Sequence, residues 1–142
     1  PILVKKIPNL KLMLTGGGFN KKMTWIINKG IVTKADLYKY IYFSKCLCVP
    51  LKFGSGTRIK ILEALCLGAI VISSKKGIEG IDIVSKKPPF IVDKKTKLIK
   101  EIINVIKNNN EFKKRANKSK KFYLEKYSMK RIIEKFINEN QI

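Results

Sequence analysis

The sequence predicts an α/β fold built on a parallel β-sheet. Short apolar runs alternate with stretches of helical spacing along most of the 142 residues. Such alternation is typical of parallel strands joined by right-handed helical crossovers. Ala69–Ser73 is apolar and β-branched, as expected for a strand that is covered on both faces of the sheet. We therefore expect helices on both faces.

The first elements are predicted to begin inside the fold. Pro1–Lys6 resembles the end of a helix that ought to follow an earlier strand, so we expect the sheet to lack its first strand. Lys11–Thr15 is then a strand that ends in three glycines, and Thr24–Asn28 is a second short strand closed by Gly30. Lys34–Phe43 is predicted to be a helix, because its apolar positions 37, 40 and 41 form one stripe.

The middle of the chain repeats the alternation. Cys46–Pro50 is a predicted strand, followed by a helix from about Thr57 to Leu67 that stops at Gly68, a suitable C-cap. Ala69–Ser73 is the next strand. After two prolines, Phe90–Val92 is the last predicted strand.

The end of the chain is predicted to be helical. Helical spacing runs from Thr96 to Glu139 and is broken near Asn108–Asn110 and near Tyr127-Ser128, which predicts three helices. A chain of this length suits one hydrophobic core. We therefore treat 1–142 as a single domain, a fragment of a larger protein, with 96–142 as its helical C-terminal part.

The charge of the chain leaves two interpretations open. The formal net charge is +21, and only three of the 31 basic residues are arginine. Readers of nucleic acid usually rely on arginine, because its planar group matches phosphates and guanine edges. We expect no nucleic-acid partner, and abundant Lys, Ile and Asn together indicate compositional bias. A cationic face can also attract an anionic membrane or a phosphorylated ligand.

Metal and membrane-spanning functions find little support. The chain has no histidine, and its three cysteines, Cys46, Cys48 and Cys66, are expected to be reduced thiols. We therefore predict no metal site and no general base of the usual imidazole type. The longest apolar run, Ala64–Ile72, is far shorter than the roughly 20 residues of a membrane span. We expect a soluble cytoplasmic protein.

Three glycine-bearing segments follow predicted strands: Gly16–Gly18, Gly54–Gly56 and Gly77–Gly80. Ligands of open parallel sheets bind at the carboxyl ends of the strands. The middle segment also opens a helix, so its free amides and the helix dipole can bind an anion. Arg58 and Lys60 add positive charge in the first turn. The alternative is a plain glycine turn with solvated basic side chains.

Glu63 is an isolated acid on an otherwise apolar helix. No other acidic residue lies between Asp36 and Glu63, and Glu63 stands beside the apolar stripe rather than opposite it. A carboxylate in that position needs a partner within the chain or hydrogen bonds from a ligand. The first alternative is an ion pair with Lys60, three residues before it.

The segment Pro50–Ala64 closely resembles the donor-site segment of family 4 glycosyltransferases. The similarity continues through Gly68–Ser74 and Gly77–Ile81, and supporting landmarks lie at Gly16–Gly18, Gly30–Val32 and Lys126–Ser128. Enzymes of this family have the GT-B architecture, in which two Rossmann-like domains face each other across a cleft. The resemblance implies that this chain is the carboxyl-terminal, nucleotide-sugar-binding domain, with a Rossmann-like sheet. It also implies an amino-terminal acceptor domain that is missing here.

The resemblance implies a role for each matching residue. Glu63 would accept hydrogen bonds from the ribose, and the backbone amides of Thr57, Arg58 and Ile59 would hold the diphosphate. Gly18 and the turn at Ile31 and Val32 would lie near the phosphates and the base. The family's first glutamate falls on Ser55 here, which puts the contact with the sugar in question. The remaining candidates are donor-loop residues or supporting residues: Gly54, Gly56, Lys60, Ser74 and Glu79.

The implied reaction is transfer from a UDP- or GDP-linked sugar, with retention of the anomeric configuration and without a metal or another cofactor. Two alternatives stay open: a non-catalytic basic module that binds nucleic acid or an anionic membrane, and another GT-B enzyme such as a sugar epimerase. Peripheral attachment to the inner membrane face is compatible with the positive charge. Base preference in nucleotide binding would separate a donor site from generic binding of polyanions.

Overall fold

A computed structural model of the chain describes residues 2–18, 22–54, 58–84 and 87–127. Its strands are β1 (Leu12–Leu14), β2 (Ile26–Asn28), β3 (Leu47–Val49), β4 (Val71–Ser73) and β5 (Phe90–Ile91). Its helices are α1 (Ile2–Lys6), α2 (Lys34–Phe43), α3 (Ile59–Cys66), the short 3-10 helix η1 (Lys76–Ile78), α4 (Lys95–Lys107) and α5 (Asn109–Tyr127). The alternation of strands and helices confirms the predicted α/β class.

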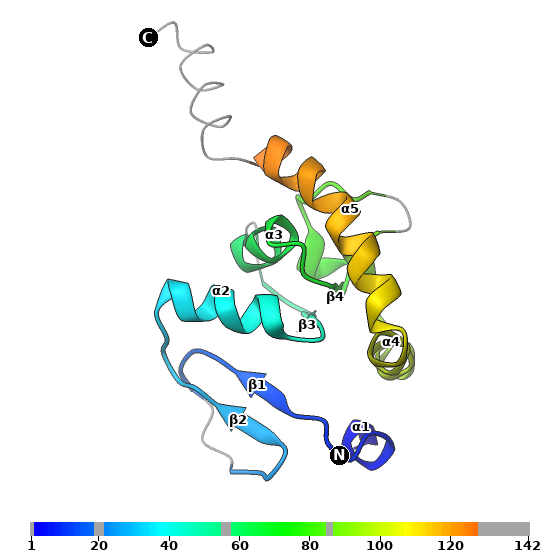
Figure 1. The fold of residues 1–142 in the computed structure, drawn as a ribbon. Helices are drawn as coiled ribbons and strands as arrows, with labels where there is room; N and C mark the ends of the chain where they lie inside the picture. The colour runs from blue at the N-terminus through cyan, green and yellow to red at the C-terminus, as the bar shows by residue number, and fades with distance from the viewer. Residues whose placement is uncertain (1, 19–21, 55–57, 85–86, 128–142) are drawn as a thin grey trace, which may run out of the picture.

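All paired strands are parallel, but they form two sheets (Figure 1). β1 pairs with β2, and β3, β4 and β5 form a second sheet with β4 in the centre. In the doubly wound strand order 3-2-1-4-5-6, the first strand separates the second from the fourth. The sequence predicts that the first strand of this order is lacking, so β1 and β3 correspond to its second and fourth strands. Within the described residues no strand lies between β1 and β3. The predicted single sheet is therefore divided in two.

Helices cover both faces of the larger sheet, as predicted. Val71 of β4 packs in one core cluster with Ile61 and Leu65 of α3. Ile72, the next residue, packs in a second cluster with Ile102 and Val105 of α4. Successive side chains of a strand point to opposite faces, so β4 is buried along its whole length. Figure 1 shows α3 on one side of β4 and α4 on the other.

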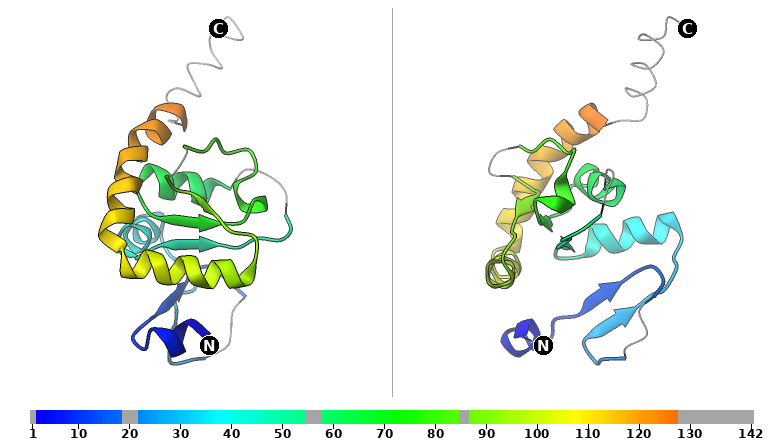
Figure 2. Two further views of the ribbon diagram at one scale, coloured as in Figure 1. Left: turned by 90° about the vertical axis from the view of Figure 1, so that its right-hand side faces the viewer. Right: turned by 180° about the vertical axis from the view of Figure 1, so that it is seen from behind.

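The helix α5 connects the two clusters. Phe112 and Ala116 near its start belong to the α4 cluster, whereas Tyr123 near its end belongs to the α3 cluster. The Tyr123 hydroxyl donates a buried hydrogen bond of 2.9 Å to the carbonyl oxygen of Pro88. In Figure 2, α5 runs along the edge of the larger sheet from α4 past α3. No helix within the described ranges is long and apolar enough to cross a membrane.

The β1–β2 pair is less well covered. Leu12, Met13 and Ile27 remain 42%, 39% and 37% exposed. α2 lies between this pair and α3, as Figures 1 and 2 show. Its buried residue Ile41 joins the α3 cluster. The smaller sheet therefore contributes little to the core.

Helix bounds agree closely with the prediction for α2, which spans Lys34–Phe43. Thr33 caps it, because its hydroxyl oxygen accepts a hydrogen bond of 3.1 Å from the amide of Asp36. In the described residues α3 starts at Ile59, and the predicted start at Thr57 lies outside them. α4 and α5 are separated at Asn108, as predicted, and the third predicted helix falls in 128–142, outside the described residues.

Candidate functional site

The carboxyl ends of β1 and β2 are joined through their glycines. The amide of Gly16 donates a hydrogen bond of 2.6 Å to the carbonyl oxygen of Gly30. Gly30 adopts φ 61°, a left-handed conformation that favours glycine. This contact places the loop that contains Gly18 beside the turn that contains Ile31 and Val32. Ile31 is 90% exposed, Gly18 is exposed and Val32 is half-buried.

Glu63 on α3 is bound by two side chains of α2. The Tyr38 hydroxyl donates a hydrogen bond of 2.8 Å to Glu63 Oε1. The Lys34 ammonium lies 3.2 Å from the same oxygen. The Lys34 side chain is 72% exposed, whereas the Glu63 side chain is only 19% exposed. Hydrogen bonding to Tyr38, followed by hydrogen bonding to Glu63, raises the pKa of Lys34 above its ordinary value. The carboxylate therefore has partners within the chain.

This pairing answers one question left open by the sequence. The partner of Glu63 is Lys34 rather than Lys60, which lies on the same helix. Because one oxygen of the carboxylate is paired inside the chain, the isolation of Glu63 in the sequence is not by itself an indication of a ligand. The pairing does locate Glu63, since Lys34 follows Val32 by two residues. Glu63 is thus paired with a residue that closely follows the Gly30–Val32 turn, where the resemblance places the base.

The start of α3 carries the candidate anion-binding residues. Arg58 is the N-cap residue, and its side chain makes no capping hydrogen bond to the first turn. Its carbonyl oxygen accepts hydrogen bonds from the amides of Ile61 and Leu62. Ile59 is 64% exposed and Lys60 is exposed. The first turn of α3 therefore faces outward beside a cationic side chain, a suitable arrangement for an anion.

Gly54 lies against the Arg58 side chain. A Cβ atom on Gly54 would be 2.5 Å from Arg58 Nη2, and the backbone of Gly54 has φ +119°. Positively charged side chains also lower the pKa of Glu79 below its usual value. Hydrogen bonding to Lys76 is the main cause of this lowering, and the charge of Arg58 adds a smaller part. Gly54, Arg58 and Glu79 therefore belong to one neighbourhood.

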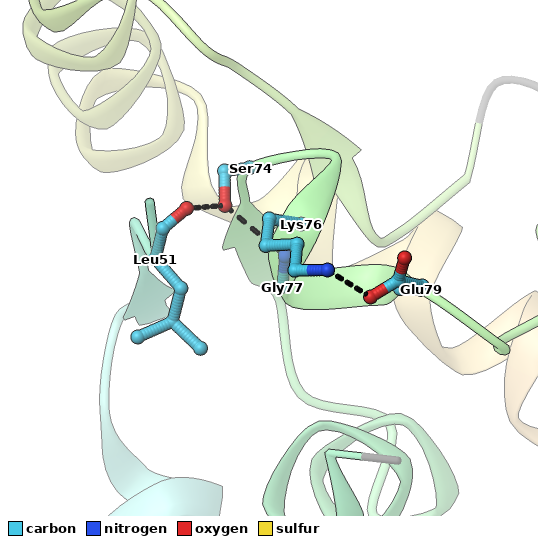
Figure 3. Close-up of polar contacts among 5 residues, drawn as sticks. All are labelled: Leu51, Ser74, Lys76, Gly77 and Glu79. Carbon is cyan, nitrogen blue, oxygen red and sulfur yellow. Dashed lines mark hydrogen bonds and ion pairs between the residues drawn. The ribbon is translucent and has the colours of Figure 1, made fainter. Parts of the chain in front are cut away.

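Ser74 ties the end of β4 to the segment that follows β3 (Figure 3). Its hydroxyl donates a hydrogen bond of 2.5 Å to the carbonyl oxygen of Leu51 and accepts one of 3.1 Å from the amide of Gly77. A Cβ on Gly77 would lie 2.2 Å from Ser73 Oγ, so the turn requires glycine. Lys76 and Glu79 form an ion pair of 2.6 Å on the outer side of this turn. Ser74 thus fixes the backbone of Leu51 relative to the end of β4.

The candidates fall into two groups that α3 connects. We assign Glu63 to the first group with Gly18, Ile31 and Val32, which lie in the loops after β1 and β2. The second group consists of Gly54, Arg58, Ile59 and Lys60 around the start of α3, together with Ser74 and Glu79 after β4. Ser55, Gly56 and Thr57 lie outside the described residues. The structure adds Lys34 and Tyr38, which sequence reasoning missed. Their i, i+4 spacing on one helix indicates a shared face, but only the packing of α2 against α3 reveals the partner.

The cysteines and acids form no obvious metal centre. Within the described ranges, no group of three or more His, Cys, Asp or Glu residues is placed to hold a metal ion. Cys46, Cys48 and Cys66 are free and half-buried. The sulfur atoms of Cys46 and Cys48 lie 3.8 Å apart. Burial is the main cause that raises the pKa of the Cys66 thiol.

Comparison with known proteins identifies the family. Residues 1–108 match the family model described as "Glycosyl transferases group 1". A protein of Klebsiella pneumoniae, described as an uncharacterized 44.6 kDa protein in the cps region, is 26% identical over 152 aligned residues. The alignment covers 99% of this chain and 39% of that protein, so the chain spans about two fifths of the relative's length. The match to the family model extends over most of the chain, which therefore belongs to the glycosyl transferases group 1 family.

Proposed function

We propose that this chain is the donor-binding half of a glycosyltransferase that moves a sugar from a UDP- or GDP-linked donor to an acceptor with retention of configuration. Membership of the glycosyl transferases group 1 family supports the transfer of a sugar. The grouping of the candidate residues at the carboxyl ends of β1, β2 and β3 supports the location, because ligands of open parallel sheets bind there.

The observation that carries the proposal is the spacing of Glu63 and the start of α3. Glu63 is four positions after Ile59, which corresponds to about 6 Å along the helix axis. One nucleotide can therefore place its diphosphate at the first turn and its ribose at Glu63. The carboxylate is 19% exposed, so a ligand can reach it. The Gly30–Val32 turn then lies on the side of the base.

The chemistry of the proposed reaction is the stabilisation of negative charge on the departing diphosphate. Backbone amides at a helix start and nearby cations are suited to that task, since they are oriented before charge develops. Ile59 and Lys60 supply the first turn of α3, and Arg58 and Lys60 supply positive charge. Ser74 and Glu79 would support the loop rather than contact the donor.

The acceptor and the cellular setting are part of the proposal. We propose that a further, amino-terminal domain binds the acceptor, in keeping with the greater length of the Klebsiella relative. That relative is described as a protein in a cps region, and we propose by extension that this chain acts in the synthesis of a polysaccharide or glycolipid. We place the protein in the cytoplasm, at the inner membrane face. Its net charge of +21 favours that attachment.

Calorimetric titration at low salt tests the proposal. We expect UDP or GDP to bind with a base preference and to be displaced by its sugar conjugates. Glu63→Ala should weaken the preferred nucleotide about 10- to 150-fold, roughly 1.5–3 kcal/mol, because the ribose loses a charged acceptor.

Glu111→Ala is the matched control. It removes the same charge and breaks an ion pair of 2.8 Å with Arg115 on α5, away from the site. Unchanged nucleotide affinity in a folded Glu63→Ala variant would reject the assignment. Equal binding of all polyanions would instead favour a basic module that recognises charge alone.

A further inference from the structure

The two contacts of Glu63 fall on a single oxygen. Tyr38 and Lys34 both approach Oε1, at 2.8 Å and 3.2 Å. An ionised carboxylate offers about four lone-pair positions on its two oxygens. Within the described part of the chain, both contacts of this carboxylate are made by Oε1, so Oε2 can accept hydrogen bonds from further donors. The two oxygens of Glu63 are thus in different environments.

The helix α2 carries both donors. Lys34 and Tyr38 are one turn apart, and the ammonium of Lys34 lies 5.6 Å from the centre of the Tyr38 ring. The cation therefore interacts with the ring as well as with the carboxylate. Tyr38 is half-buried, whereas Lys34 is largely exposed. Of the two donors, Tyr38 is the more restricted and defines the direction of the carboxylate.

We propose that Tyr38, assisted by Lys34, is a positioning residue that anchors Glu63 by Oε1 and presents Oε2 to the ribose hydroxyls of the donor. This inference rests on the proposed function and adds to it a determinant of specificity. Tyr38 on α2 then favours ribonucleotides over deoxyribonucleotides through Glu63, without contacting the ligand itself. A carboxylate free to rotate would lose part of this selection, because it would have to be ordered at each binding event.

The experiment compares the preferred nucleotide, UDP or GDP, with its 2′,3′-dideoxy form by calorimetry on the full chain. In the wild-type protein we expect the ribose form to bind about tenfold more tightly. Tyr38→Phe keeps the ring and removes only the hydroxyl. We expect it to reduce this preference to about threefold or less, mainly by weakening the ribose form.

Tyr40→Phe is the matched control, because Tyr40 lies on the same helix and its hydroxyl makes no hydrogen bond within the described part of the chain. It should keep the tenfold preference. Lys34→Met provides a second test of the same oxygen and should give an intermediate preference. Thermal unfolding of each variant shows whether it is folded.

The outcomes separate this inference from the proposed function. Loss of ribose preference in Tyr38→Phe but not in Tyr40→Phe supports the inference. Equal weakening of both nucleotides would show a merely structural Tyr38 and overturn it, as would full preference in folded Tyr38→Phe and Lys34→Met. If Glu63→Gln itself left the preference unchanged, the assignment of Glu63 to the ribose would fail instead.

Discussion

At the scale of single residues, Gly54 shows how the loop before α3 depends on one missing atom. Its φ of +119° is a conformation that other residues rarely adopt, and a Cβ would lie 2.5 Å from the Arg58 guanidinium. The lack of a side chain thus allows both the turn and the close approach of Arg58.

Replacing Gly54 with alanine should destabilise the chain by about 1–3 kcal/mol, because the backbone must strain or Arg58 must move. Urea unfolding measures the change, and nucleotide affinity should fall with the displacement of Arg58. Gly17→Ala is the control, since Gly17 has no positive φ and its Cβ would meet nothing within 4 Å. An unfolding midpoint that is the same for both variants would contradict the role given to Gly54.

Sequence reasoning located the candidate acid but not its partners. Glu63 could be singled out because it is the one acid of a buried helix. Lys34, however, is far from it in the sequence, and the two meet only because α2 packs against α3. Sequence spacing can predict only ion pairs within one helix, such as the expected pair of Lys60 and Glu63. Long-range packing decides otherwise here.

At the scale of elements, the end of α5 is tied to the segment that follows η1. Tyr127 accepts a hydrogen bond of 2.8 Å from the amide of Asp82, and Lys126 forms an ion pair with the same aspartate. Hydrogen bonding to Lys126 is the main cause that lowers the pKa of Asp82. Tyr123 adds the buried bond to Pro88. These contacts hold Asp82 and Pro88 against the end of α5.

Tyr123→Phe tests this connection through its pH dependence. Burial raises the pKa of Tyr123 to about 12, above the value of about 10 for an exposed tyrosine. Between these values the folded chain keeps a proton that the unfolded chain has lost, so the free energy of unfolding falls as pH rises. Tyr123→Phe should lack this component and should also lose about 1–3 kcal/mol at neutral pH.

Chemical denaturation from pH 7 to 12 measures both effects. Tyr42→Phe is the control, because it makes the same change of side chain at a residue that is 48% exposed. If Tyr123→Phe showed the wild-type slope above pH 10, the buried hydroxyl would not be the group responsible.

Element boundaries were predictable where local chemistry marks them. The apolar stripe of α2 gave its bounds correctly, and Thr33 caps its start; α3 ends next to the predicted Gly68, which has φ 70°. The division of the sheet was not predicted. Strand pairing depends on which edges meet in space, and the apolar patterns of β1 and β3 carry no information about a neighbour.

At the scale of the whole molecule, stability is concentrated around β4. This strand is fully buried between α3 and α4, whereas β1 and β2 have no buried residue. Regions with few buried apolar contacts open more readily than the core. The two sheets should therefore differ in local stability.

Native-state hydrogen exchange should reveal this difference. The amides of β1 and β2 should show protection at least about tenfold lower than those of β4. Mass spectrometry of peptides or nuclear magnetic resonance can measure it at neutral pH. Equal protection in both sheets would mean that the smaller sheet opens only with the core and would contradict this view.

The central claim is that Glu63 and the start of α3 bind one nucleotide sugar, and a crystal structure of the chain with such a compound tests it most directly. We expect a ribose hydroxyl within about 3.2 Å of Glu63 Oε2 and the diphosphate at the first turn of α3. Tyr38 and Lys34 should remain on Oε1. A nucleotide bound elsewhere, or a carboxylate that stays with Lys34 without touching the ligand, would contradict the account.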